Sequence, residues 1–269
     1  MSASFMSTNS VAAPKTTPFR KEFVQFLFSL CVAQIAVFVA AFVATPQHFD
    51  ADKAAVWTHL LLALIVVWTS WFGWRRSVET QVLDESGPFK RAAMLALLDI
   101  VLVVMYFVLI RSVELTNVEQ GKKASSFAAL ESASARPESR VLLVVFGTFL
   151  IWDVVSKGRL SLKFWSHPDW KWPVPSVIAL LCTGYVHFAA SGVRAESVRT
   201  TVLFDMALIC VVLLFRQAKE IQNLFLAKRR AALDAGQLQK LRNDGIGTLV
   251  LSVLFVTFLV LAMRFAMAP

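Results

Sequence analysis

The segment AAMLALLDIVLVVMYFVLI, residues 92–110, decides the fold of this chain. Apart from Asp99 and Tyr106, every side chain in the segment is apolar. At about 1.5 Å of rise per residue, a helix of this length crosses most of the roughly 30 Å hydrocarbon core of a bilayer. The segment therefore predicts a transmembrane helix that carries a carboxylate inside the membrane.

Six further apolar segments surround it along the chain. They cover about residues 23–44, 54–74, 141–156, 174–193, 200–215 and 246–267. None alternates apolar and polar residues as barrel strands do, and 57% hydrophobic against 17% charged residues is too apolar for an ordinary soluble domain. We expect an all-α, polytopic integral membrane protein with a bundle of about seven transmembrane helices. The segments 141–156 and 200–215 are short, and we expect their helices to extend further.

The distribution of Lys and Arg predicts the topology. With the N-terminus inside the cell, 18 of the 27 Lys and Arg residues face the cytoplasm, which is the bias of the positive-inside rule. We expect an N-in, C-out protein whose net charge of +9 reports topology and contact with anionic lipid headgroups on the cytoplasmic side, with no nucleic acid as partner.

The polar stretches divide the chain further. Residues 1–20 are expected to form a disordered cytoplasmic N-terminus, and residues 21–269 one membrane domain. Between the spans we expect an external loop at 111–140, a cytoplasmic interfacial loop at 157–173 and a cytoplasmic helical extension at 216–245, which lacks proline.

Two of these stretches are candidates for contact with lipid or a partner. The loop 157–173 carries Trp165 and Trp170 beside lysines, a mixture typical of the headgroup region, although a re-entrant or gating segment is the alternative. The extension after the sixth span carries three consecutive cations. These are Lys228, Arg229 and Arg230. They indicate either a solvated helix or a surface for a cytoplasmic partner or a homo-oligomer.

Three aspartates lie within the predicted spans. Placing an ionisable side chain in hydrocarbon costs at least about 2.5–3.5 kcal/mol, so each needs an explanation. Asp99 has no cation nearby in sequence and needs a partner on another helix, a water or a proton. Asp153 has Lys157 four residues later, which offers a simple ion pair. Asp205 lies in the half of the sixth span nearest the exterior.

His187 and Asp205 are expected at the same depth on neighbouring antiparallel helices. A His–Asp pair there would be mutually stabilising. It indicates either an ion-binding or conduction site or a polar contact that only holds two helices together.

Hydroxyl groups and one further histidine are candidates for lining a pore or cavity. Thr69, Ser70 and Thr148 fall in the cytoplasmic half of their spans, and His59 falls in the external half. The alternative is that each hydroxyl bonds a carbonyl of its own helix.

Motifs for catalysis or cofactor binding are absent from the sequence. There is no P-loop, no H-E-x-x-H, no G-x-S-x-G and no Cys/His metal pattern, and Cys31, Cys182 and Cys210 all lie inside predicted spans. We therefore expect no enzyme, no metal and no cofactor. The lack of an N-x-[ST] sequon is compatible with a bacterial inner (plasma) membrane.

Two functions remain. The first is a channel or transporter for a cation or protons that uses the intramembrane carboxylates, with Asp99, Asp153, Asp205 and His187 as ion-binding residues. The second is a non-catalytic sensor, signalling or assembly subunit that contacts a cytoplasmic partner through 157–173 and 216–245.

Overall fold

Six long helices make up nearly all of the residues that the structure describes. The computed structural model describes residues 18–44, 53–80, 91–119, 134–156, 173–193 and 197–230. The helices are α1 (Pro18–Val43), α2 (Ala54–Thr80), α3 (Arg91–Glu119), α4 (Ala135–Ser156), α5 (Val174–Gly192) and α6 (Val198–Arg230). Each is long and apolar enough to cross a membrane. The chain is an all-α membrane protein.

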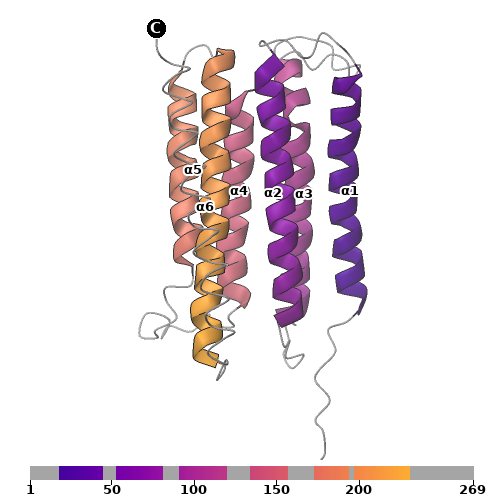
Figure 1. Ribbon diagram of the computed structural model, residues 1–269, viewed down its shortest axis with the longest axis vertical. Coiled ribbons are helices and arrows are strands. Elements are labelled where there is room, and N and C mark those ends of the chain that lie inside the picture. Colours follow the sequence, from indigo (N-terminus) through magenta and orange to yellow (C-terminus); the bar gives the residue numbers. More distant parts are fainter. Residues whose placement is uncertain are drawn as a thin grey trace, which may run out of the picture.

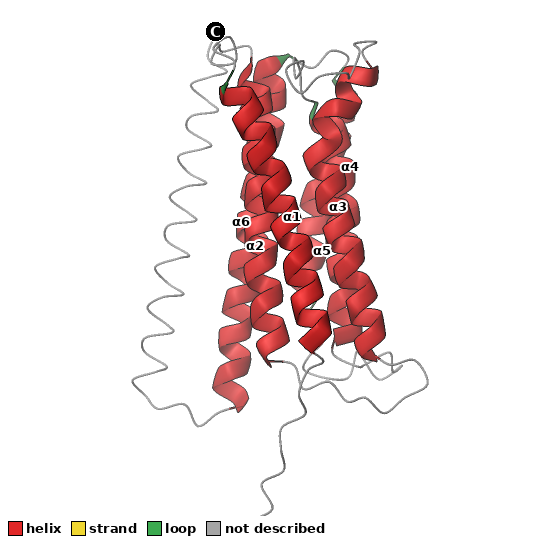
Figure 2. Cartoon of the chain, turned by 90° about the vertical axis from the view of Figure 1, so that its right-hand side faces the viewer, coloured by secondary structure: helices red, strands yellow, loops and turns green. Residues whose placement is uncertain are grey.

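Successive helices run in opposite directions and lie side by side (Figure 1). α2 and α6 form one layer, α3 and α4 form the other, and α1 and α5 close the two edges (Figures 1 and 2). Around the bundle the order is thus α1, α2, α6, α5, α4, α3. We call the end at which α1 begins the near end and the opposite end the far end.

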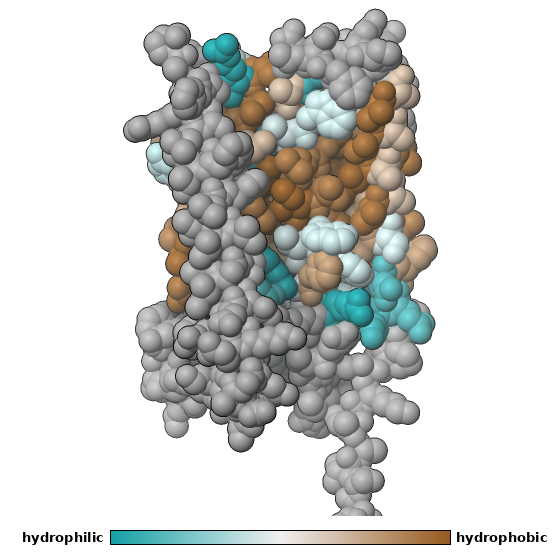
Figure 3. Space-filling view, viewed as in Figure 1, coloured by the Kyte–Doolittle hydropathy of each residue, from teal (hydrophilic) through white to brown (hydrophobic). Residues whose placement is uncertain are grey.

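The surface of the bundle is as apolar as its interior. Fully buried side chains such as Tyr106, Phe146 and Leu62 fill the core. Large apolar side chains also point outward, and Phe188 on α5 is 79% exposed. Figure 3 shows apolar residues across the middle of the bundle and polar ones toward its ends. Such an exposed apolar surface would be unstable in water and is what a bilayer requires.

Local capping sets the start of two helices earlier than hydropathy alone suggests. Ser134 accepts a hydrogen bond from the backbone N–H of Arg136 (3.3 Å) at the start of α4. Ser197 accepts one from the backbone N–H of Thr200 (3.2 Å) at the start of α6. These are N-cap contacts, which satisfy orphan N–H groups of the first turn. α4 and α6 accordingly extend beyond the predicted segments 141–156 and 200–215.

The predicted loop 111–140 is helical at both ends. α3 continues to Glu119 and α4 begins at Ala135. The prediction ended each span where charged residues begin, but a helix ends where its backbone is capped. In the same way α1 begins at Pro18, inside the N-terminus predicted to be disordered, and α6 continues to Arg230.

Several predictions fall outside the described residues. They concern the seventh apolar segment (246–267), residues 1–17, and the loop that contains Trp165 and Trp170. Lys228, Arg229 and Arg230 lie on α6, but their side chains are not described. A seventh helix and the orientation in the membrane stay predictions.

Packing between α4 and α6 is expected to be sensitive to side-chain volume. Phe146 is 2% exposed and meets Phe215 edge-on at 5.1 Å between ring centroids. Separated helices would still lie in lipid, so the cavity term dominates the cost of Phe146→Ala. At about 24 cal/mol per Å³, a cavity of roughly 80 Å³ costs roughly 2 kcal/mol.

Unfolding of the purified protein with a denaturing detergent measures this effect. Phe188→Ala is the matched control, because its ring faces outward. Equal losses of stability in the two variants would contradict the placement of Phe146 in the core.

Candidate functional site

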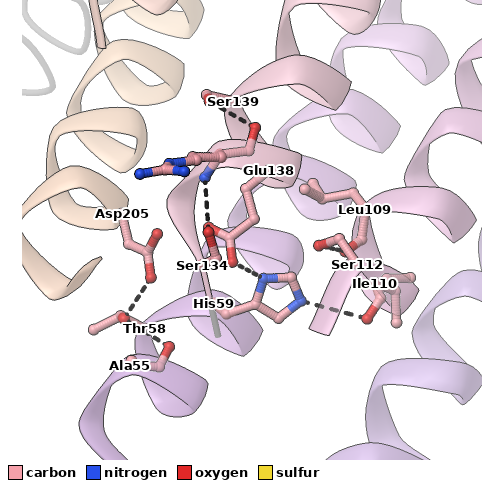
Figure 4. Close-up of polar contacts among 11 residues, drawn as sticks. Ala55, Thr58, His59, Leu109, Ile110, Ser112, Ser134, Glu138, Ser139 and Asp205 are labelled. Atoms are coloured by element: carbon pink, nitrogen blue, oxygen red, sulfur yellow. Dashed lines mark hydrogen bonds and ion pairs between the residues drawn. The ribbon is translucent and has the colours of Figure 1, made fainter. Parts of the chain in front are cut away.

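Three ionisable side chains meet at the far end of the bundle (Figure 4). His59 on α2, Glu138 on α4 and Asp205 on α6 are 0%, 1% and 0% exposed. Nδ1 of His59 lies 2.5 Å from Oε1 of Glu138, and Nε2 lies 3.4 Å from the carbonyl oxygen of Ile110 on α3. The imidazole on α2 therefore contacts α4 and α3, and Asp205 on α6 acts on it by charge. We call His59, Glu138, Asp205 and Thr58 the far cluster.

Asp205 lies beside Glu138 within the far cluster. The hydroxyl of Thr58 donates a hydrogen bond to Oδ2 of Asp205 at 2.7 Å. Its other oxygen, Oδ1, is buried and accepts no hydrogen bond from a donor that the structure describes. Glu138 acts on Asp205 both by charge and by side-chain contact, and Figure 4 shows the two carboxyl groups next to each other. The cluster thus contains two adjacent carboxyl groups in a dry site.

The predicted pair between His187 and Asp205 does not form. Nδ1 of His187 lies 2.9 Å from the hydroxyl of Ser139 on α4, while Asp205 faces α2 and α4. Equal depth places two residues at the same level but does not set the rotation of each helix about its axis. His187 therefore joins α5 to α4 and takes no part in the far cluster.

Arg136 also links α4 to α5 at the far end of the bundle. Its guanidinium donates hydrogen bonds to the carbonyl oxygens of Ala190 (3.1 Å) and Val193. The last carbonyls of a helix lack partners within the helix, and the C-terminal end of its dipole attracts cations. Arg136 is thus committed to the end of α5.

At the near end, Asp99 is held by two tryptophans. Nε1 of Trp74 on α2 donates to Oδ2 at 3.2 Å, and Nε1 of Trp152 on α4 donates to Oδ1 at 3.1 Å. Asp99 is 2% exposed. The sequence required a partner on another helix, a water or a proton, and the structure supplies two indole N–H groups.

Asp153 is held by an ion pair between helices. Nζ of Lys219 on α6 donates to Oδ2 of Asp153 at 2.5 Å, and the hydroxyl of Ser176 on α5 donates to the same oxygen. The partner predicted from sequence, Lys157, lies outside the described residues. Asp153 thereby joins α4, α5 and α6 near the ends of their apolar stretches.

A cavity of about 40 Å³ lies between the two ends and is lined by residues of α2, α4 and α6. Its lining is mostly apolar, with Thr69, Ser70 and Arg216 as the polar members. The hydroxyl of Thr69 donates to the carbonyl oxygen of Ile65 at 2.7 Å. A water needs roughly 10–15 Å³ by this measure, so the volume suits two or three waters.

Two of the predicted lining residues do not border this cavity. The hydroxyl of Thr148 donates to the carbonyl oxygen of Val144 at 2.8 Å, as a hydroxyl inside an apolar helix commonly does. His59 belongs to the far cluster. Of these four predicted lining residues, only Thr69 and Ser70 border the cavity.

No group of three or more His, Cys, Asp or Glu side chains in the described ranges is arranged to hold a metal ion. Cys31, Cys182 and Cys210, all within those ranges, are free thiols.

The chain matches no family model, no curated protein and no solved structure.

Sequence reasoning missed two central residues. Glu138 was assigned to the external loop, although Ser134 and Pro137 mark a helix start just before it. Lys219 was counted as a topological charge. No sequence signal pairs it with Asp153, because the two are 66 residues apart and meet only through the packing of α4 against α6.

The ion pair between Asp153 and Lys219 is expected to show strong coupling. Removing one partner leaves a buried charge uncompensated, so Lys219→Met should destabilise the bundle by about 3 kcal/mol or more. The double variant Asp153→Asn with Lys219→Met should recover much of that loss, because neither charge remains.

Unfolding of the four proteins of this double-mutant cycle gives the coupling energy. Strictly additive losses would contradict a direct interaction. Glu22→Gln, at an exposed position on α1, serves as a control for loss of a carboxylate.

Proposed function

We propose that this protein is a channel or transporter that moves a cation or protons across a membrane through its buried carboxyl groups. The observation that carries the proposal is the far cluster, where two carboxyl groups and an imidazole from three helices meet inside the apolar core. Placing each ionisable group in hydrocarbon costs at least about 2.5–3.5 kcal/mol, whereas neutral hydroxyl groups could join the helices at a much lower free-energy cost. A cluster of ionisable groups in the apolar core despite this free-energy cost indicates a function.

The polar groups follow one line through the bundle. Along α2 lie His59, then Thr69 and Ser70 at the cavity, then Trp74 beside Asp99. At about 1.5 Å per residue, the 15 residues from His59 to Trp74 cover roughly 22 Å, most of the thickness of the hydrocarbon core. This line, along the junction of α2 with α4 and α6, is the pathway we propose.

The proposed pathway contains an apolar barrier. Leu62, Ala63 and Val66, each at most 2% exposed, lie along α2 between His59 of the far cluster and Thr69 at the cavity. An apolar barrier between two polar regions is what a gated pathway needs, because dry apolar side chains block ions until water enters. The geometry supports a carrier or a gated channel over a permanently open pore.

Asp153 has a different role in this proposal. Its charge is balanced by Lys219, and its contacts fix three helices. We assign it to packing, and assign ion binding to Asp205, Glu138 and Asp99.

Flux through proteoliposomes tests the proposal. Asp205→Asn and Asp99→Asn remove a charge at each end of the pathway while keeping the side-chain shape. Each should lower flux by about ten-fold or more, equivalent to at least about 1.4 kcal/mol at the limiting step.

Glu22→Gln is the matched control, since it removes an exposed carboxylate and should leave flux unchanged. Wild-type flux in both pathway variants would reject these site assignments. A wild-type protein that moves no ion would reject the proposal itself.

The signalling or assembly alternative is favoured by one observation. α6 continues as helix to Arg230, beyond the apolar stretch that ends at Gln222. A helix that projects from the membrane can dock a partner. Replacing Lys228, Arg229 and Arg230 by Ala should then abolish co-purification of a partner or a second copy, and unchanged co-purification would reject this surface.

We further propose a seventh span at 246–267 and an N-in, C-out orientation in a bacterial inner membrane. The charge bias supports this orientation. Alkaline phosphatase fused after Pro269 should be active and green fluorescent protein fused there should be dark. The reverse result would place the C-terminus in the cytoplasm and overturn the topology.

A further inference from the structure

We infer that Glu138 and Asp205 share one exchangeable proton, and that the proton is the species this protein moves. The second part rests on the transport function proposed above and specifies its cargo. The first part is a binding site that can be measured on the purified protein without any transport.

The contacts of Asp205 lead to the shared proton. Oδ2 is occupied by the hydroxyl of Thr58, whereas Oδ1 is buried beside Glu138 without a donor from the described residues. Two ionised carboxylates so close together in an apolar site would repel strongly. One proton turns that repulsion into a hydrogen bond, in which the carboxylic acid O–H donates to the other carboxylate.

His59 and Thr58 contact the carboxyl groups of Glu138 and Asp205 and position them. The imidazole lies against Oε1 of Glu138 and the hydroxyl against Oδ2 of Asp205. Each carboxyl group therefore has one oxygen engaged by a neighbour on α2 and the rest of the group directed into the cluster. Binding forms one O–H bond on either carboxyl group, and release breaks that bond and leaves both ionised.

Other charged side chains lie at the same end of the bundle. On α4, Arg136 is bound to the end of α5, and Arg140 acts on His187, which contacts Ser139. Among the described residues, Lys53 just before α2, Arg111 on α3 and Arg199 on α6 also carry charge at this end, and their side chains are exposed or partly buried. Within the far cluster, His59 and Thr58 contact the carboxyl pair.

The geometry favours a proton over a metal cation. A hard cation such as Ca²⁺ takes six to eight oxygen ligands, and Mg²⁺ demands near-ideal octahedral geometry. The part of the chain described by the structure has no three acidic, His or Cys groups arranged around such an ion. The closed far cluster, with members at most 8% exposed, offers hydrogen-bond partners instead, which are all a proton requires.

Infrared spectroscopy of the purified wild-type protein tests the shared proton directly. A protonated carboxyl group in a dry site gives a C=O stretching band that shifts in deuterium oxide and disappears as pH is raised. We expect such a band in the wild type. Its absence at every pH would overturn the inference without any variant.

Variants then show whether the proton is shared. Because one proton serves both groups, Glu138→Gln and Asp205→Asn should each remove the whole titrating band, whereas Glu22→Gln should leave it intact. Gel filtration and helix content confirm folding of each variant. A titrating band that survives in both single variants would overturn the shared site.

Ion dependence of flux tests the cargo. Proteoliposomes with an internal pH indicator should acidify under an imposed proton gradient at a rate independent of Na⁺ and K⁺, and both variants should be slower by about ten-fold or more. Flux of Na⁺ or K⁺ without proton flux would overturn the proton as cargo and leave the transport function standing. A titrating infrared band with no flux of any ion would overturn the transport function and the cargo with it.

Discussion

Hydrocarbon offers no hydrogen-bond partners, so every polar side chain inside this bundle must find its partner on another helix or on its own backbone. The resulting polar contacts between helices stabilise the bundle. Thr58 and His59 join α2 to α6 and α4, while Asp99 joins α3 to α2 and α4 through indole N–H groups. Lys219 joins α6 to α4. Apolar packing fills the space between these contacts, but the polar contacts specify which helix lies against which.

The two ends of the bundle satisfy this constraint by different means. At the near end Asp99 and Asp153 meet dedicated donors, two indoles for Asp99 and an ammonium with a hydroxyl for Asp153. At the far end two acids meet one another, with one imidazole and one hydroxyl beside them. The near end therefore gives these two aspartates donors on neighbouring helices, whereas the far end places two acids beside each other.

Hydropathy predicted the helical membrane class and the six spans that the structure describes, because span length follows from bilayer thickness. It also placed Asp99, Asp153 and Asp205 inside them. Hydropathy could not predict which residues contact these aspartates. Local periodicity does not report the rotation of each helix or the order α1, α2, α6, α5, α4, α3 around the bundle. Glu138 was missed because a hydropathy window ends at charged residues, whereas α4 begins at its cap on Ser134. The predicted pair of His187 and Asp205 was wrong because the sequence does not report the rotation of each helix about its axis.

Gly73 has a consequence for the wall of the central cavity. A Cβ there would lie 2.5 Å from a guanidinium nitrogen of Arg216, so the bare backbone of α2 is what lets this side chain lie across it, held by Glu220. Both residues form the wall of the cavity closest to the near end. Arg216 is thus a flexible side chain in the cavity wall, which can change rotamer while every helix axis stays in place.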